Sequence, residues 1–192
     1  VGSEEITPDN IEAALGIRTD FGRLAQEFPL EKQYLVNRNP FIESLSKNIL
    51  SNELTVLTGS PGSGKSWALT EICDNLKEEG YLVAKHYCYL EPGDPATQKR
   101  ILIKSVFGNL MAELIDQAPS LRDSISSFYA SGPKELLDLL DKAIKEEPER
   151  KIVLIVDGLD HISRILTESS DIAKIETDII DELVCLDLPS SV

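Results

Sequence analysis

The feature that most constrains this chain is an eight-residue loop rich in glycine. Residues 59–66 read GSPGSGKS and fit the pattern G-x-x-x-x-G-K-[ST] without a mismatch. The preceding run, ELTVLT at 53–58, is β-prone, and the following residues have the apolar spacing of an amphipathic helix. A strand, then this loop, then a helix is the context in which the pattern binds phosphate groups. That context disfavours the alternative of a glycine-rich turn that fits by chance.

The residue types of this loop suit an anionic phosphate chain. Glycines let the backbone curl so that successive N–H groups converge at the positive end of the following helix. Lys65 adds a full positive charge, and the Ser66 hydroxyl can ligate Mg²⁺. We therefore expect a nucleotide with Mg²⁺ to bind at Gly59, Ser60, Pro61, Gly62, Ser63, Gly64, Lys65, Ser66 and Trp67.

A second acidic motif follows a run of apolar, largely β-branched residues. The run KIVLIV at 151–156 is typical of a strand buried on both faces, and it ends in Asp157-Gly-Leu-Asp160-His161. Ligands bind at the carboxyl ends of such strands. We expect Asp157 to hold Mg²⁺ opposite Ser66, and Asp160 to polarise the attacking water. The alternative makes Asp157 a turn former and Asp160 a helix cap.

The order of elements predicts the fold class. Strands are expected at 53–58, 81–90 and 151–156, and helices at 9–15, 41–50, 97–117, 133–145 and 171–186, with another directly after the glycine loop. This alternation predicts a three-layer α/β sandwich of the P-loop NTPase kind, with a mostly parallel sheet. Such a sheet normally has at least five strands, so we expect a fragment of a larger protein.

Composition narrows the classes of partner. The net charge of −14 disfavours a broad nucleic-acid or anionic-lipid surface, and no apolar run approaches the roughly 20 residues that span a bilayer. Cys73, Cys88 and Cys185 are odd in number and widely spaced, which predicts reduced thiols packed in the core and a cytoplasmic location. Only two histidines occur, so no zinc spacing is present. His86 is expected to pack inside a strand, and His161 to lie near the Mg²⁺ site.

The two phosphate motifs together resemble the nucleotide-binding domain of STAND-type NTPases, including the NACHT branch. The small residue after the first Asp of DGLD separates this group from AAA-type ATPases, whose strand usually ends in Asp-Glu. The segment LVNRNPF at 35–41 also resembles a family segment that contacts adenine, which implies that Arg38 lies near the base. The resemblance divides the chain into a linker or flap at 1–34 and an NTPase core at 35–192, truncated before the sensor strand.

The resemblance implies a switch rather than a motor. Its members bind ATP with Mg²⁺, hydrolyse it slowly, oligomerise when a protein ligand is sensed by a C-terminal region, and activate an effector domain in antiviral defence or innate immunity. Lys65 and Asp160 are the catalytic residues that it implies here. Two alternatives stay open: a turnover ATPase of the AAA or another type, and a nucleotide-holding scaffold without hydrolysis. The residues alone do not separate ATP from GTP.

Overall fold

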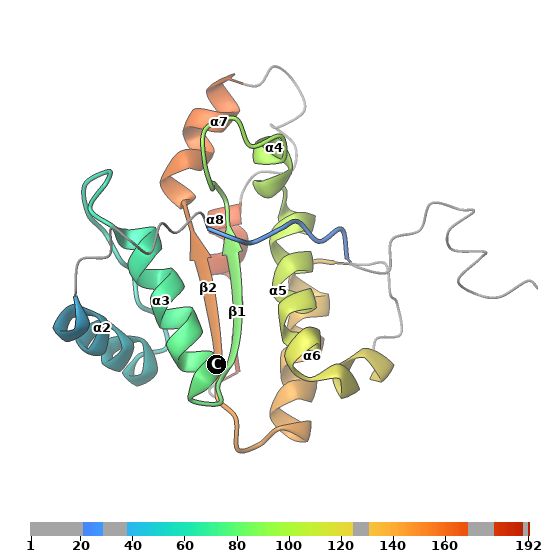
Figure 1. Cartoon of the computed structure of the whole chain (residues 1–192). Coiled ribbons are helices and arrows are strands. Elements are labelled where there is room, and N and C mark those ends of the chain that lie inside the picture. Colours follow the sequence, from blue (N-terminus) through green and yellow to red (C-terminus); the bar gives the residue numbers. More distant parts are fainter. Residues whose placement is uncertain (1–20, 29–37, 125–130, 169–178, 190–191) are drawn as a thin grey trace, which may run out of the picture.

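The computed structural model describes residues 21–28, 38–124, 131–168, 179–189 and 192. Within these ranges helices alternate with two strands (Figure 1). In chain order the elements are α2 (Asn39–Ser51), α3 (Lys65–Glu78), β1 (Leu82–Tyr87), α4 (Thr97–Arg100), α5 (Ile103–Gln117), η2 (Pro119–Ser124), α6 (Pro133–Glu146), β2 (Ile152–Asp157), η3 (Leu159–His161), α7 (Ile162–Glu168) and α8 (Ile179–Val184).

The sheet of the described residues consists of β1 and β2, paired in parallel from Leu82 opposite Ile152 to Tyr87 opposite Asp157. These two strands confirm the predictions for 81–90 and 151–156, with shorter bounds. The predicted strand at 53–58 is wrong: the segment has no ladder partner among the described residues. Leu54 and Val56 are 76% and 73% exposed. A β-prone run becomes a strand only when a neighbour pairs with its backbone.

Helices pack on both faces of the sheet. Odd-numbered strand residues, including Val83, Val153 and Ile155, form one apolar cluster with α2 and α3. Even-numbered residues, including Leu82, Ala84 and Ile152, form the larger cluster with α5, α6 and α8. This division follows from the two-residue period of a strand. The chain is therefore a mixed α/β structure whose parallel strands lie between two helical layers (Figure 1).

The outer edge of β1 is bonded by side-chain amides. Gln117 accepts a hydrogen bond from Val83 N–H (3.0 Å) and donates one to Val83 C=O (2.9 Å), while Gln26 accepts one from Tyr87 N–H (2.7 Å). Gln26 belongs to residues 21–28, which cross α5 and β1 as an extended strap (Figure 1). The strap lies directly on α5 at Gly108, where a Cβ would come within 2.3 Å of the Phe21 carbonyl oxygen. This part of the expected linker or flap is thus packed onto the sheet.

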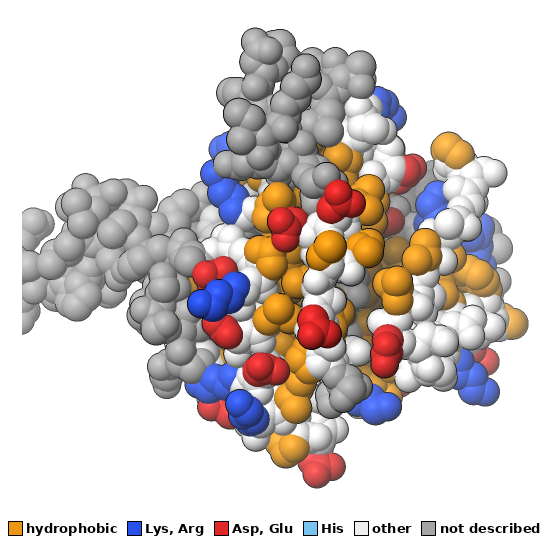
Figure 2. All heavy atoms as spheres, turned by 180° about the vertical axis from the view of Figure 1, so that it is seen from behind, with side chains coloured by type: hydrophobic (Ala, Val, Ile, Leu, Met, Phe, Trp, Pro, Cys, Tyr) orange, Lys and Arg blue, Asp and Glu red, His pale blue; other side chains and the backbone are white. Residues whose placement is uncertain are grey.

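The opposite side of the molecule, beyond β2, is apolar. Figure 2 shows hydrophobic side chains gathered in a central band on this face, with acidic side chains scattered among them. The large hydrophobic residues that are exposed in the described part of the chain are Phe41, Leu54, Val56, Ile180 and Val184. The two edges of the sheet therefore differ: one is bonded by glutamines, and the other faces an apolar surface.

Most predicted helices are present with small shifts of their ends. Residues 41–50 extend to Asn39–Ser51, and 133–145 to Pro133–Glu146. The predicted helix 97–117 is interrupted at Ile101–Leu102, where Leu102 adopts an extended conformation, so α4 and α5 are separate. The predicted helix at 9–15 and the first half of that at 171–186 lie outside the described residues.

Candidate functional site

The glycine loop opens helix α3, as its sequence predicts. Gly62 and Gly64 have φ angles of 74° and 86°, a region that favours glycine. Ser63 N–H bonds to Ser60 C=O (3.1 Å), and Ala68 N–H bonds to Gly64 C=O (3.0 Å) as the first helical turn closes. The amides at the start of α3 have no partner within the helix, so this end can receive an anion.

Two cationic side chains lie on the loop. The Lys65 ammonium donates hydrogen bonds to the carbonyl oxygens of Gly59 (2.9 Å) and Ser60 (3.4 Å). The lysine thus connects the end of the loop to its beginning. The Arg38 guanidinium donates to Ser63 C=O (2.8 Å). Nη1 of the same guanidinium lies 2.7 Å from the position that a Cβ on Gly64 would occupy. The structure thus brings Arg38 to the loop, although 25 residues separate Arg38 from Ser63 in the sequence. Trp67 in the first turn of α3 is half-buried.

Asp157 is a buried acidic residue at the carboxyl end of β2. It ends β2, is 8% exposed, and its Oδ2 has no hydrogen-bond partner within the described part of the chain. Asp157 shares the odd-numbered face with Val153 and Ile155, which pack against α3. Figure 1 shows that α3 begins at the end of the sheet where β1 and β2 finish. A buried carboxylate oxygen without a donor is costly, and a cation is one group that would satisfy it.

Thr70 and Tyr87 connect α3 to the end of β1, and sequence reasoning missed both. The Thr70 hydroxyl lies 2.7 Å from Ser66 C=O and 2.6 Å from the Tyr87 hydroxyl. Tyr87 is 1% exposed and stands opposite Asp157 in the sheet. The pair therefore links the backbone of Ser66 on α3 to the last residue of β1, which is the register partner of Asp157. The sequence carried no signal for this pair, because alternation along a strand does not give the register that places Tyr87 opposite Asp157.

Asp160 and His161 lie in a more open environment than Asp157. The Asp160 side chain is 65% exposed, and its Oδ2 lies 3.9 Å from His161 Nε2. The His161 ring stacks on Tyr89 at a centroid distance of 4.2 Å and an angle of 3°, while its Nδ1 contacts Arg164 Nη2 at 2.6 Å. The guanidinium of Arg164 also lies over the Tyr89 ring, at 5.1 Å. The His161 ring is thus held in place by stacking on Tyr89 and by its contact with Arg164.

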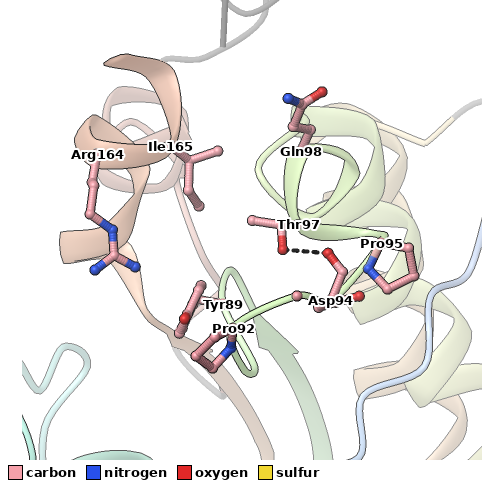
Figure 3. Close-up of a pocket in the computed structure, with 9 residues that line it drawn as sticks. Tyr89, Pro92, Asp94, Pro95, Thr97, Gln98, Arg164 and Ile165 are labelled. Atoms are coloured by element: carbon pink, nitrogen blue, oxygen red, sulfur yellow. Dashed lines mark hydrogen bonds between the residues drawn. The ribbon is translucent and has the colours of Figure 1, made fainter. Parts of the chain in front are cut away.

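A separate cleft of about 570 Å³ lies between α7 and the loop after β1 (Figure 3). Figure 3 shows Arg164 and Ile165 on one wall and Thr97, Gln98 and Pro95 on the other. Asp94 in this cleft pairs with the buried Arg100 at 2.5 Å. Burial raises the pKa of Asp94, but hydrogen bonds from Arg100 and Ala96 and the charge of Arg100 outweigh burial and lower the pKa overall. None of the predicted site residues lines this cleft.

Cys73 and Cys88 are buried, as predicted, whereas the prediction of a core position is wrong for Cys185, which is exposed after helix α8. Burial raises the pKa values of Cys73 and Cys88 to about 12, and the charge of Asp157 adds to the effect at Cys88. Both are therefore protonated thiols at neutral pH. Within the described ranges no three His, Cys, Asp or Glu side chains gather as a metal-binding group. Among the helices of those ranges, none has the length and apolar character needed to cross a bilayer.

The chain is an α/β protein with two parallel strands, a glycine loop that opens helix α3, and a buried aspartate at the end of β2. A protein-family model described as Nephrocystin 3, N-terminal matches residues 33–184, which include both motifs. The chain belongs to this family. Its description names no nucleotide and no activity, so the resemblance to STAND-type NTPases stays a prediction. No solved structure gives a significant match to the chain.

Proposed function

We propose that this chain is the nucleotide-binding switch domain of a larger signalling protein, built as a P-loop NTPase sandwich of the STAND type. It would bind ATP with Mg²⁺ through residues 59–66 and hydrolyse it slowly. The observation that carries the proposal is the unpartnered, buried Oδ2 of Asp157 on the face of the sheet that packs against α3. A polar group in that condition is rare in a folded protein unless a ligand satisfies it.

The chain's own residues fit a magnesium–nucleotide complex. A carboxylate and a hydroxyl are oxygen ligands, which Mg²⁺ prefers, and two protein ligands are a usual number because phosphate oxygens and waters complete the shell. Asp157 and Ser66 would hold the ion. When bound, Mg²⁺ neutralises charge that develops on the phosphate oxygens.

Lys65 and the loop amides would bind the phosphates. Lys65 now donates to Gly59 and Ser60 carbonyls, and exchanging these neutral acceptors for phosphate oxygens strengthens each of its hydrogen bonds. Gly62 has no atom within 4 Å of where a Cβ would stand, so the loop is open on this side. Arg38, already bonded to the loop, would contact the nucleotide from its other side.

Nucleotide binding is the first property to measure. Titration calorimetry of the intact protein with ATP and with GTP, each with Mg²⁺ and with EDTA, should give saturable binding that Mg²⁺ tightens. Lys65→Ala should lose at least about tenfold in affinity, since a charge-assisted contact to phosphate is removed. Lys47→Ala is the matched control, because Lys47 is exposed on α2 away from the loop. Absence of heat with both nucleotides would refute the proposal.

A nucleotide-holding scaffold without hydrolysis is the second candidate, and the exposure of Asp160 favours it. A general base works best when it is shielded and aimed at its water, whereas the Asp160 side chain is 65% exposed. Single-turnover hydrolysis of ATP by Asp160→Asn separates the two functions, with binding checked in parallel. A rate at least tenfold below that of the unaltered protein supports the switch. An unchanged rate rejects Asp160 as the base, and no turnover in either protein supports the scaffold.

Assembly and partners follow from the resemblance only. We propose that the larger protein oligomerises after a protein ligand is sensed outside this chain, and that an effector domain is thereby activated in cytoplasmic defence. Mass measurement of the larger protein with ATP, with ADP and without nucleotide tests this step. Lys65→Ala should remain in the smaller state under all three conditions; normal assembly by the variant would contradict the switch.

A further inference from the structure

Tyr87 is a buried tyrosine whose hydroxyl is committed to one contact. Its oxygen lies 2.6 Å from Thr70 Oγ1, and Thr70 Oγ1 lies 2.7 Å from Ser66 C=O. A carbonyl oxygen can only accept, so the single Thr70 hydroxyl proton is donated to Ser66. Tyr87 must then donate its own proton to Thr70. The two hydroxyls form a directed chain from the end of β1 to the first turn of α3.

Tyr87 is kept in the donor state by its surroundings. Burial raises its pKa, the hydrogen bond with Thr70 lowers it, and the nearby groups Cys73 and Asp157 raise it further, so that the net change is upward. The phenol is therefore protonated at neutral pH. Asp157 is the register partner of Tyr87 in the neighbouring strand.

Tyr87 is itself held by the strap. Tyr87 N–H donates to Gln26 Oε1 at 2.7 Å, and the Phe28 ring lies 5.6 Å from the Tyr87 ring. On the other side, Cys88 N–H bonds to Asp157 C=O at 2.8 Å and ties the two strand ends together. The backbone of Tyr87 is thus held by the strap, the adjoining residue is tied to β2, and the Tyr87 hydroxyl bonds to Thr70 on α3.

We propose that Tyr87 is a positioning residue of the magnesium–nucleotide site: through Thr70, its hydroxyl fixes the backbone of Ser66 relative to the end of the sheet that carries Asp157. The inference rests on the proposed function, because it assigns a further residue to the same site. The strap residues Gln26 and Phe28 act on the site through Tyr87. The loop amides and Lys65, which bind phosphate without the metal, do not depend on this hydroxyl.

The test separates metal-dependent from metal-independent binding. The affinity for ADP is measured with Mg²⁺ and with EDTA, and the ratio of the two affinities is the readout. In Tyr87→Phe the ratio should fall about fivefold, the size of one lost hydrogen bond, while the affinity in EDTA stays within about twofold. Thr70→Val should behave alike and Thr70→Ser should keep the ratio. The double variant Y87F/T70V should equal either single variant, because both act through one chain of contacts.

Tyr81→Phe is the matched control, because Tyr81 precedes β1 at the opposite end of the strand. Its ratio should equal that of the unaltered protein. An unchanged ratio in Tyr87→Phe overturns the inference, and so does an equal loss of affinity with Mg²⁺ and with EDTA, which is the mark of a merely structural role. Failure of the unaltered protein to bind ADP at all refutes the proposed function instead.

Discussion

The buried histidine on β1 predicts that the protein loses stability in mild acid. His86 is 0% exposed and is held by hydrogen bonds at both ring nitrogens. Nε2 lies 2.8 Å from the Arg100 carbonyl oxygen and must carry the proton, because that oxygen only accepts. Nδ1 is then the acceptor for the Asn109 amide at 2.9 Å. The neutral ring is fully satisfied in this tautomer.

Protonation of Nδ1 would place two donors against each other. The Asn109 amide cannot turn to relieve the conflict, because its Oδ1 already accepts from Leu24 N–H at 2.8 Å. Gln26 is fixed in the same way, since its Oε1 accepts from Tyr87 N–H while its Nε2 lies 3.5 Å from His86 Nδ1. Burial is the largest cause that lowers the His86 pKa, to about 4. The hydrogen bond to Arg100 C=O opposes this, and the charge of Arg100 adds to the lowering.

The sign and size of the effect follow from proton linkage. The His86 pKa is 6.5 in the unfolded chain and about 4 in the folded protein. Between these pH values the unfolded chain binds a proton at His86 and the folded protein does not, so acid favours unfolding. With these two pKa values, the free energy of unfolding should fall by about 2 kcal/mol between pH 7.5 and pH 5 through this group alone. Above pH 7.5 the contribution of His86 is complete and constant.

Urea denaturation at several pH values measures this fall. Because carboxylates also titrate toward pH 5, the quantity to compare is the difference between the unaltered protein and His86→Gln, which has no titrating ring. The variant is expected to be less stable at pH 7.5 and to lose about 2 kcal/mol less on going to pH 5. His161→Gln, which keeps His86, should retain the full fall. Parallel pH curves for the unaltered protein and His86→Gln would refute the reasoning.

Three further substitutions test other parts of the structure. Asp157→Asn should raise the free energy of unfolding without Mg²⁺ by about 2 kcal/mol, because a buried charge is removed. The same variant should no longer be stabilised by Mg²⁺–ADP. A lower stability of the variant in EDTA would contradict an uncompensated carboxylate at this position. Gln117→Leu should destabilise by about 2 kcal/mol, since two bonds to Val83 are lost, whereas the exposed Gln98→Leu should be neutral in the same denaturation assay. Gly108→Ala should displace the strap and speed tryptic cleavage at Arg23, although alanine favours helix by about 1 kcal/mol; an unchanged cleavage rate would show that the strap adjusts.

Much of the fold was predictable from local patterns. The apolar run at 151–156 and the amphipathic stripe at 133–145 specified β2 and α6, because each pattern matches the period of its element. The glycines of 59–66 likewise specified a turn that opens a helix, and Gly62 and Gly64 have positive φ angles. These features depend on neighbours within a few residues.

Features that depend on distant neighbours were not predictable. The run 53–58 has strand composition, but no pattern within it tells whether a partner lies beside it, and Val56 is exposed in the structure. The contact of Tyr87 with Thr70 joins residues 17 apart, and that of Gln26 with Tyr87 joins residues 61 apart. The interruption between α4 and α5 contains neither glycine nor proline, so no residue there indicates the end of a helix. In each case tertiary packing decided what local sequence left undetermined.

The side-chain amides of Gln117 and Gln26 at the edge of β1 determine on which edge a further strand can pair with the sheet. Val83 N–H and C=O already bond to Gln117, and Tyr87 N–H already bonds to Gln26. Lys85, between them on the strand, adds a positive charge. An incoming polypeptide would have to break these bonds and desolvate the ammonium before it could align there, which guards against stray edge-to-edge association. Any additional strand is therefore expected to pair with the edge of β2 that faces away from β1. That strand ends in Asp157, the proposed Mg²⁺ ligand.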